Sequence, residues 1–448
     1  MNKKYEIDMT EGSLLKNIIR FSIPLMLSGI LQLLYNAADV VVVGRFAGSD
    51  SLAAVGSTSS LFNLLVNLFM GFATGTSGMV SRAYGSKDQN QVSKTVHTAI
   101  ALSIAFGFII GILGLVVAKP ALTLMGTPQN VLPKAALYIR ILFLGMPAQT
   151  IYNFGSAILR SVGDTKRPLY FLTVSGIFNV VVNLILVICF HMDVAGVAIA
   201  TILAQYISAA LVMLCLIHST GVYRVVPKKI KIYKEQFLQM LKIGIPAAIQ
   251  GSLFSISNVL IQSSINLFGS LAMAGSSIAS NIEGFVYTSM NSVYQAAITS
   301  SGQNLGAKNI KRIKQTVVNC FFVVVTIGLS LTALVFLFKD LIISIYTSDS
   351  AVAEFAIIKI MYVMLPYILC GIMEIFAGTM RGLGYALTPM LVSLMGACGI
   401  RILWIMTVFQ FSKTLPTLYF CYPVSWFTTA MAHLVCIFFA LKKLKKEI

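Results

Sequence analysis

The chain contains few charged residues. Only 11% of its 448 residues are Asp, Glu, Lys or Arg, whereas soluble domains carry roughly 25%. Hydrophobic residues make up 57%, and the mean hydropathy is +0.85. A water-soluble globule of this composition could not cover its surface with polar groups. The composition therefore excludes a soluble enzyme or regulator and indicates a membrane protein.

The chain also lacks the patterns of metal-binding, disulfide-bonded and nucleic-acid-binding proteins. Its seven cysteines lie within or beside apolar stretches without Cys-X-X-Cys spacing, and its four histidines form no ligand pair. The net charge of +18 comes from basic residues clustered between apolar runs, as is typical of juxtamembrane Lys and Arg. We expect no nucleic-acid partner and no cofactor.

Long apolar runs dominate what is present. Since a helical span needs about 20 apolar residues, the runs predict an all-α polytopic membrane protein with twelve transmembrane helices and a bilayer as its surroundings. The second and eighth runs are weakly hydrophobic, so they should face protein or water rather than lipid. The predicted spans are 17–44, 53–79, 95–118, 135–159, 168–190, 196–217, 243–266, 271–300, 315–337, 355–379, 388–410 and 417–440.

The connections between these runs differ in basic charge. One set is rich in Lys and Arg, including Lys3, Lys4, the 218–242 segment and the C-terminal Lys cluster. The opposite set holds only Arg45, Lys119, Lys134, Arg140, Lys339, Lys359 and Lys413. The positive-inside rule then predicts that both termini are cytoplasmic, in a multi-pass protein of the cytoplasmic membrane. An even number of spans satisfies this orientation.

The sequence repeats itself. Arg160-Ser-Val-Gly163 matches Arg381-Gly-Leu-Gly384, and Pro168 matches Pro389, at a common offset of 221 residues. Two Ile-Pro pairs, ending at Pro24 and Pro246, open corresponding helices. We predict an N-terminal lobe (1–217, helices one to six), a cytoplasmic linker (218–242) and a C-terminal lobe (243–448, helices seven to twelve). Six spans per repeat give both lobes one orientation, related by a pseudo-twofold axis along the membrane normal.

Three carboxylates lie well inside predicted spans: Asp39, Glu283 and Glu374. An ionisable group in a bilayer costs roughly 2.5–3.5 kcal/mol on insertion scales and usually marks an ion or substrate pathway. Asp39 suits a proton carrier or, with further oxygen ligands, a Na⁺ site. The alternative for each acid is a structural carboxylate that accepts hydrogen bonds inside its lobe.

The motifs together resemble those of the multidrug and toxic compound extrusion (MATE) family, over essentially the whole chain. The resemblance rests on Pro24, Asn36, Asp39, Gly44, Gly48, Leu52, Ala53, Gly56, Gly85, the 160–165 segment with Pro168, Ala195, Gly196, Ala200, Thr201 and their second-half counterparts. It implies ion-coupled export of amphipathic, often cationic compounds by two six-helix lobes that form a V-shaped cleft.

The resemblance also implies ion-coupling residues. In one branch of the family the first-helix Asp works with polar residues of helices five and six, and the matching positions are Asn179, Asn183 and Thr201. Asn183 stands where that branch often has a carboxylate. Another branch carries a Glu in helix seven, and helix seven here has no carboxylate.

The second lobe offers Glu283 and Glu374 instead, as a second coupling site or as counter-charges for a bound cation. Glu374 corresponds to Asn153 by the repeat offset. Tyr35 and Tyr287 could stack on flat or cationic compounds through cation–π contacts. With Asn36, these residues form the expected substrate-binding set.

Taken together, the residues favour a secondary antiporter, acting as a monomer, that exchanges organic cations for H⁺ or Na⁺ by alternating access. The alternative is a flippase for lipid-linked or polysaccharide precursors, which should line its cleft with Arg and Lys. Arg401 is the only deep basic residue that we expect, against three deep acids. A membrane enzyme should show clustered catalytic residues at one membrane face, and the sequence shows none.

Overall fold

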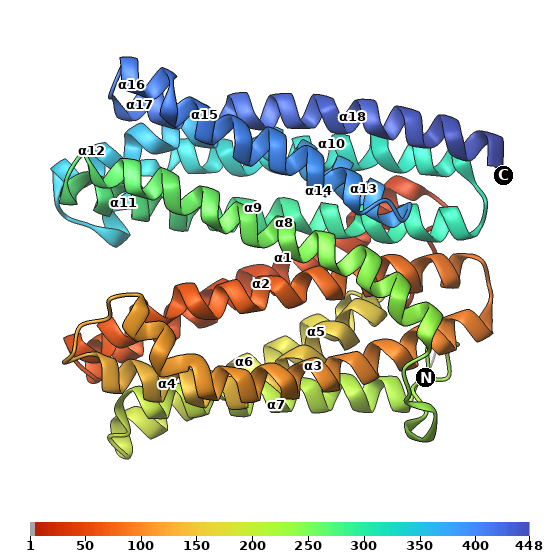
Figure 1. Ribbon diagram of the computed structural model, residues 1–448, viewed down its shortest axis with the longest axis horizontal. Coiled ribbons are helices and arrows are strands. Elements are labelled where there is room, and N and C mark those ends of the chain that lie inside the picture. The colour runs from red at the N-terminus through yellow and green to blue at the C-terminus, as the bar shows by residue number, and fades with distance from the viewer. Residues whose placement is uncertain (1–4, 448) are drawn as a thin grey trace. The chain divides into compact units, whose positions relative to one another are not determined.

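The structure is a computed structural model that describes residues 5–447, with side chains throughout except at 49, 60, 63, 64, 67–69 and 447. Lys3 and Lys4, which entered the orientation argument, lie outside the described residues. Within the described part the fold is all-helical and contains no strand (Figure 1).

The helices divide between two compact units. The first unit comprises residues 5–7 and Leu27–Leu241, and the second comprises Asp8–Met26 and residues 242–447. The units divide inside α1 (Leu14–Phe46), shortly after Pro24, and again inside α8 (Lys234–Asn266), between Leu241 and Lys242. The predicted first lobe included all of helix one, whereas the N-terminal part of this helix packs with the second unit. The predicted lobe boundaries otherwise stay a prediction.

The first unit packs its long helices around α5, which contacts α2, α3 and α7, while α6 lies along α7. Its elements are α2 (Ser49–Gly85), α3 (Gln89–Leu124), α4 (Leu132–Leu144), α5 (Met146–Ser161), α6 (Lys166–Leu184), η2 (Ile185–Cys189), α7 (Asp193–Ile217) and η3 (Pro227–Lys229), with the C-terminal part of α1.

The second unit repeats this plan around α13, which contacts α9, α10 and α18. Its elements are α8 (Lys234–Asn266) from residue 242 onward, α9 (Ser270–Gly306), α10 (Ile310–Leu337), α11 (Lys339–Tyr346), α12 (Ser350–Lys359), η4 (Ile360–Met364), α13 (Tyr367–Gly382), α14 (Leu387–Ser393), η5 (Leu394–Gly399), α15 (Ile400–Met406), α16 (Val408–Phe411), α17 (Leu415–Tyr419) and α18 (Cys421–Glu447).

Each predicted span falls on a helix or on a chain of consecutive helical segments. By length and composition, eight described helices can cross a membrane, or ten when two bent helix pairs count as one span each. The two remaining predicted spans are α2 and α9, both 37 residues long. These are the two runs that the sequence marks as weakly hydrophobic.

Proline and glycine explain the bent pairs. The helix axis turns by 47° between α4 and α5, where Gly145 precedes Met146 and Pro147, and by 45° before α13, where Pro366 precedes Tyr367. Proline removes a backbone donor and clashes with the preceding turn, so the helix bends there. The two bends occupy corresponding places in the two repeats, which shows that the repeat extends to helix geometry.

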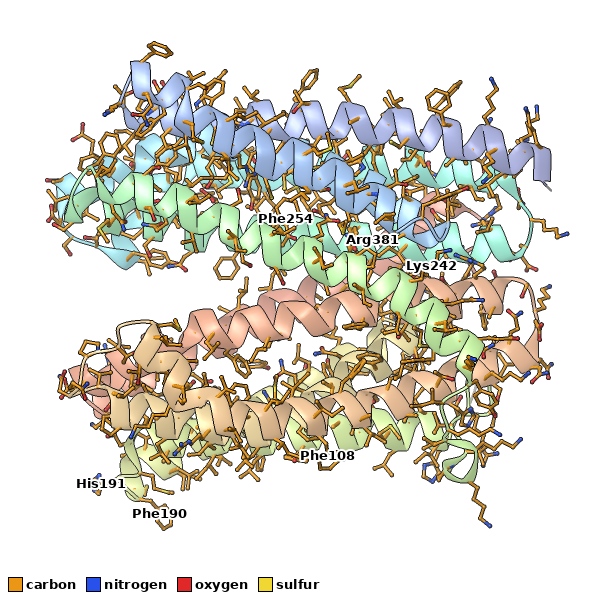
Figure 2. All side chains as sticks on the ribbon, in the orientation of Figure 1. Phe108, Phe190, His191, Lys242, Phe254 and Arg381 are labelled. Carbon is orange, nitrogen blue, oxygen red and sulfur yellow. The ribbon has the colours of Figure 1, made fainter. Side chains whose placement is uncertain are left out.

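Large apolar side chains cover the outside of the helices. Phe108 on α3 is 57% exposed and Phe190, after η2, is 66% exposed, and both point away from the helical packing in Figure 2. Exposed apolar surface of this extent is unusual in a soluble monomer but is expected where lipid is the solvent. The expectation of a polytopic membrane protein is therefore confirmed.

Candidate functional site

Asp39 lies at the centre of a polar cluster in the first unit. Its Oδ1 accepts a hydrogen bond from Asn183 Nδ2 at 2.7 Å, and its Oδ2 lies 3.3 Å from the hydroxyl of Thr201. Asn179 Nδ2 lies 3.4 Å from the same hydroxyl. The structure thus brings together all four residues that were expected to act in ion coupling.

Helix geometry explains why these residues meet. Asn179 and Asn183 are four residues apart on α6 and therefore share one face of that helix. Gly176 lies one turn earlier, where a Cβ atom would come within 1.9 Å of the Tyr35 ring of α1. Because glycine leaves room for that ring, α1 and α6 approach closely enough for the Asp39–Asn183 hydrogen bond.

The cluster contains more acceptor oxygens than donors. The side-chain carbonyl oxygens of Asn179 and Asn183 are buried without a hydrogen-bond partner among the described residues, and Asp39 contributes two carboxylate oxygens. Unpaired buried acceptors are costly unless a cation or proton donor satisfies them. Carboxylate, amide and hydroxyl oxygens are also the ligands that hard cations prefer. The arrangement can therefore hold a proton or a small cation.

The expected substrate contacts divide between the two units. Tyr35, Asn36 and Asn153 belong to the first unit, and Asn36 is exposed on α1. Glu283, Glu374 and Tyr287 belong to the second, where Tyr287 is 39% exposed. Their role in substrate binding stays a prediction.

Glu283 has a partner that the sequence argument missed. The ammonium group of Lys359 lies 3.5 Å from Glu283 Oε1, 2.5 Å from the hydroxyl of Ser280 and 3.3 Å from the carbonyl oxygen of Ser276. Lys359 was assigned to an outer connection, and Arg401 was expected to be the only deep basic residue. Both expectations are wrong, because Lys359 is 3% exposed at the end of α12. The surrounding sequence Ile357-Ile358-Lys359-Ile360-Met361 was the available signal.

Arg381, in the last turn of α13, is also buried and only 6% exposed. Its guanidinium donates to Gln250 Oε1 of α8 at 2.6 Å and to the hydroxyl of Tyr294 of α9. These bonds join three helices of the second unit. No ion pair to Glu374 is found among the described side chains, although the Arg381 and Glu374 charges interact at a longer distance.

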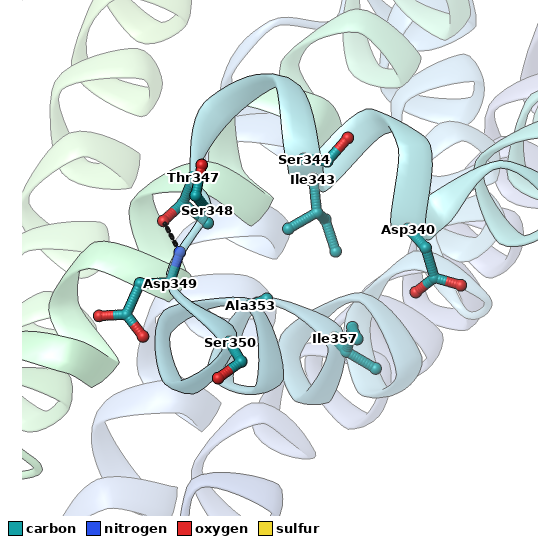
Figure 3. A pocket seen from close by; sticks show the side chains of 9 residues that line it. All are labelled: Asp340, Ile343, Ser344, Thr347, Ser348, Asp349, Ser350, Ala353 and Ile357. Carbon is teal, nitrogen blue, oxygen red and sulfur yellow. Dashed lines mark hydrogen bonds between the residues drawn. The ribbon is translucent and has the colours of Figure 1, made fainter.

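A small pocket lies between α11 and α12, and none of the predicted site residues lines it. Asp340, Ile343 and Ile357 are among the residues that line it, and the backbone N–H of Asp349 donates to the Thr347 hydroxyl at its edge (Figure 3). The residues that line this pocket come from α11, α12 and the short connection between them, and they do not form a cluster of reactive side chains. The Asp39 cluster remains the candidate site.

The fold and the site together define a class of protein. An all-helical chain built from two copies of one helical unit, with an apolar outer surface and a carboxylate set among amides within its spans, is a polytopic membrane transporter rather than an enzyme.

The family model named MatE matches the chain twice, over residues 24–185 and 246–407. The chain belongs to this family, and the resemblance seen in the sequence is confirmed. Both matches begin at a proline that opens the repeat, Pro24 or Pro246.

Similar proteins cover nearly the whole chain. It is 29% identical over 400 residues to the probable multidrug resistance protein YoeA of Bacillus subtilis, covering 88% of this chain and 86% of that protein. It is 24% identical over 393 residues to the multidrug export protein MepA of Staphylococcus aureus, covering 87% of each. The fold matches a solved structure of the outward-facing conformation of a multidrug resistance MATE family transporter with a TM-score of 0.92 and 21% identity, covering 98% of this chain and 99% of that one.

Proposed function

We propose that this protein is a multidrug efflux antiporter that exports amphipathic organic cations in exchange for H⁺ or Na⁺. The Asp39 cluster is the observation that carries the proposal. A carboxylate surrounded by amide and hydroxyl groups from α6 and α7 can bind and release a coupling cation. The names of YoeA and MepA support the drug-export part.

The charge balance supports cationic substrates. Glu374 has no ion-pair partner among the described side chains and interacts with Arg381 only at a longer distance, which supports a role as a counter-charge for an organic cation. Glu283 is paired with Lys359, which makes it a weaker candidate for the same task. We therefore assign the leading substrate role in the second unit to Glu374.

The repeat and α1 support transport by alternating access. The continuous helix α1 contributes to both compact units, and Pro24 lies close to its point of division. A proline in a helix provides a place where the helix can bend, so ion binding at Asp39 can be communicated along α1. The excess of basic residues in one set of connections supports cytoplasmic termini in the cytoplasmic membrane.

The test uses proteoliposomes with an imposed H⁺ or Na⁺ gradient and a fluorescent organic cation. We compare the wild type with Asp39→Asn, which keeps the shape of the side chain and removes its charge. Asp340→Asn is the matched control, because Asp340 is an exposed carboxylate in a surface pair with Lys339. We expect one gradient to drive wild-type and control transport and Asp39→Asn to abolish it.

The active gradient identifies the coupling ion. Absence of cation movement under both gradients would overturn the proposal and favour lipid-linked substrates. Full gradient-driven transport by Asp39→Asn would show that the coupling ion binds elsewhere.

A further inference from the structure

The second unit buries an arginine that has no acidic partner. Arg401 of α15 is 4% exposed, and no carboxylate lies within ion-pair distance of it among the described residues. A buried charge of this kind in a membrane span is costly and usually marks a functional pathway. The question is what compensates the guanidinium.

Aromatic rings and two weak acceptors supply only part of the compensation. The guanidinium carbon lies 4.5 Å from the centre of the Tyr422 ring and 5.7 Å from that of Trp426, both on α18. Nε donates to the Ser425 hydroxyl at 3.1 Å, and Nη1 lies 3.4 Å from Asn258 Oδ1 on α8. These partners are uncharged, so the cluster keeps its full positive charge.

By the internal repeat, this cluster of the second unit corresponds in sequence to the Asp39 cluster of the first. Tyr422 corresponds to Thr201 at the offset of 221 residues, and Arg401 follows the residue that corresponds to Asn179. At the place of Asp39, offset by 222 residues as Pro246 is from Pro24, α8 carries Ile261, and Asn258 lies one turn before it. The corresponding helices thus build an acid-centred cluster in one unit and an arginine-centred cluster in the other.

Arg401 contacts one end of a row of exposed polar side chains on α8, which we call the polar stripe. Asn258, Gln262 and Asn266 follow one another at helical spacing, and all three are exposed. Exposed amides on a membrane-spanning helix face water or protein rather than lipid. Asn258 is both part of this stripe and a hydrogen-bond partner of Arg401, so a ligand that moves along the stripe reaches the guanidinium by displacing one long hydrogen bond.

We propose that Arg401, Asn258 and the Tyr422–Trp426 pair form an anion-recognition site that binds a monoanion of the carboxylate or halide class. The planar guanidinium suits two-pronged binding of a carboxylate. The carboxylate belongs to an amphipathic substrate that also carries an amine, or the anion is free chloride. The substrate form extends the proposed transport function, and the binding itself does not depend on it.

A fluorescence titration tests the binding. The chain has two tryptophans, so Trp404→Phe leaves Trp426 beside Arg401 as the single reporter. In purified protein, iodide should quench this fluorescence saturably, and chloride or a small carboxylate should compete. Arg401→Gln should weaken the apparent affinity at least about tenfold, which corresponds to about 1.4 kcal/mol. Asn266→Ala, at the far end of the stripe, should leave it unchanged. Linear quenching in the wild type, or equal quenching in Arg401→Gln, overturns the site.

A transport comparison distinguishes the two sources of the anion. Proteoliposomes receive either an amphiphile that carries an amine and a carboxylate or its methyl ester, which keeps only the amine. If the substrate supplies the anion, Arg401→Gln lowers kcat/KM for the acid at least about tenfold and leaves the ester unchanged, which also shows that the variant is folded. If Arg401→Gln changes kcat/KM for the acid and the ester equally, and chloride competes with iodide in the quenching experiment, the site binds free chloride. If the wild type transports neither compound, the proposed function fails, and the titration still decides the anion site.

Discussion

Removing Lys359 should destabilise the protein strongly, and removing Glu283 together with it should restore most of the lost stability. The ammonium group has three donors and three acceptors around it, from Ser276, Ser280 and Glu283. The two charged side chains are 4% and 12% exposed. Lys359→Met leaves Glu283 buried without its counter-charge, which is the costly half of breaking a buried ion pair.

The distance gives the expected magnitude. Two unit charges 3.5 Å apart attract by about 5 kcal/mol at an effective dielectric constant near 20. Removal of one partner from a buried pair typically costs about 3–5 kcal/mol, whereas replacement of both by apolar or neutral groups is often close to neutral. We expect Lys359→Met to lower the free energy of unfolding by about 3–5 kcal/mol and Glu283→Gln to lower it less, because Gln still accepts a hydrogen bond from Lys359. The double variant should lie within about 1 kcal/mol of the wild type.

The assay is a double-mutant cycle on unfolding of the purified protein in detergent, with retention of helical signal as the readout. Lys339→Met is the matched control, because Lys339 pairs with Asp340 at the surface and its loss should cost at most about 1 kcal/mol. The reasoning is refuted if the single effects of Lys359→Met and Glu283→Gln simply add in the double variant within about 0.5 kcal/mol, as independent sites do.

Two further predictions concern other parts of the fold. Gly107→Ala should destabilise the protein by about 1–3 kcal/mol, because the added Cβ would lie 2.5 Å from the Pro147 Cα. Gly284→Ala should stabilise it by about 0.5–1 kcal/mol, because a Cβ there would meet no neighbouring atom within 4 Å. Equal unfolding midpoints for the two variants would contradict this prediction. Burial raises the pKa of Asp164, in the loop between α5 and α6, to about 6. The folded state then binds more protons than the unfolded state between about pH 4 and 6, so this carboxyl lowers stability as pH rises through that window. The unfolding midpoint of Asp164→Asn, relative to that of the wild type, should therefore rise as the pH increases from about 4 to about 7. A difference between the two midpoints that stays constant with pH would refute the raised pKa of Asp164.

The sequence alone determined the class, the spans and the repeat of this protein. These features follow from composition and local order, because a bilayer imposes long apolar helices and a duplicated unit repeats its turn residues at one offset. The resemblance to a known family supplied the expected partners of Asp39, which are Asn179, Asn183 and Thr201. The spacing of Asn179 and Asn183 adds only that these two share a helical face, and no local pattern connects any of the three to Asp39.

Only the tertiary structure decided which buried charges are compensated. Lys359 and Glu283 are 76 positions apart in the chain, and their pairing depends on how α12 packs on α9. The same holds for Arg401, whose surroundings come from α8 and α18, and for α1, which divides between two compact units. Hydropathy patterns record how apolar a segment is, whereas the energy of a buried charge depends on atoms a few ångströms away that belong to other helices.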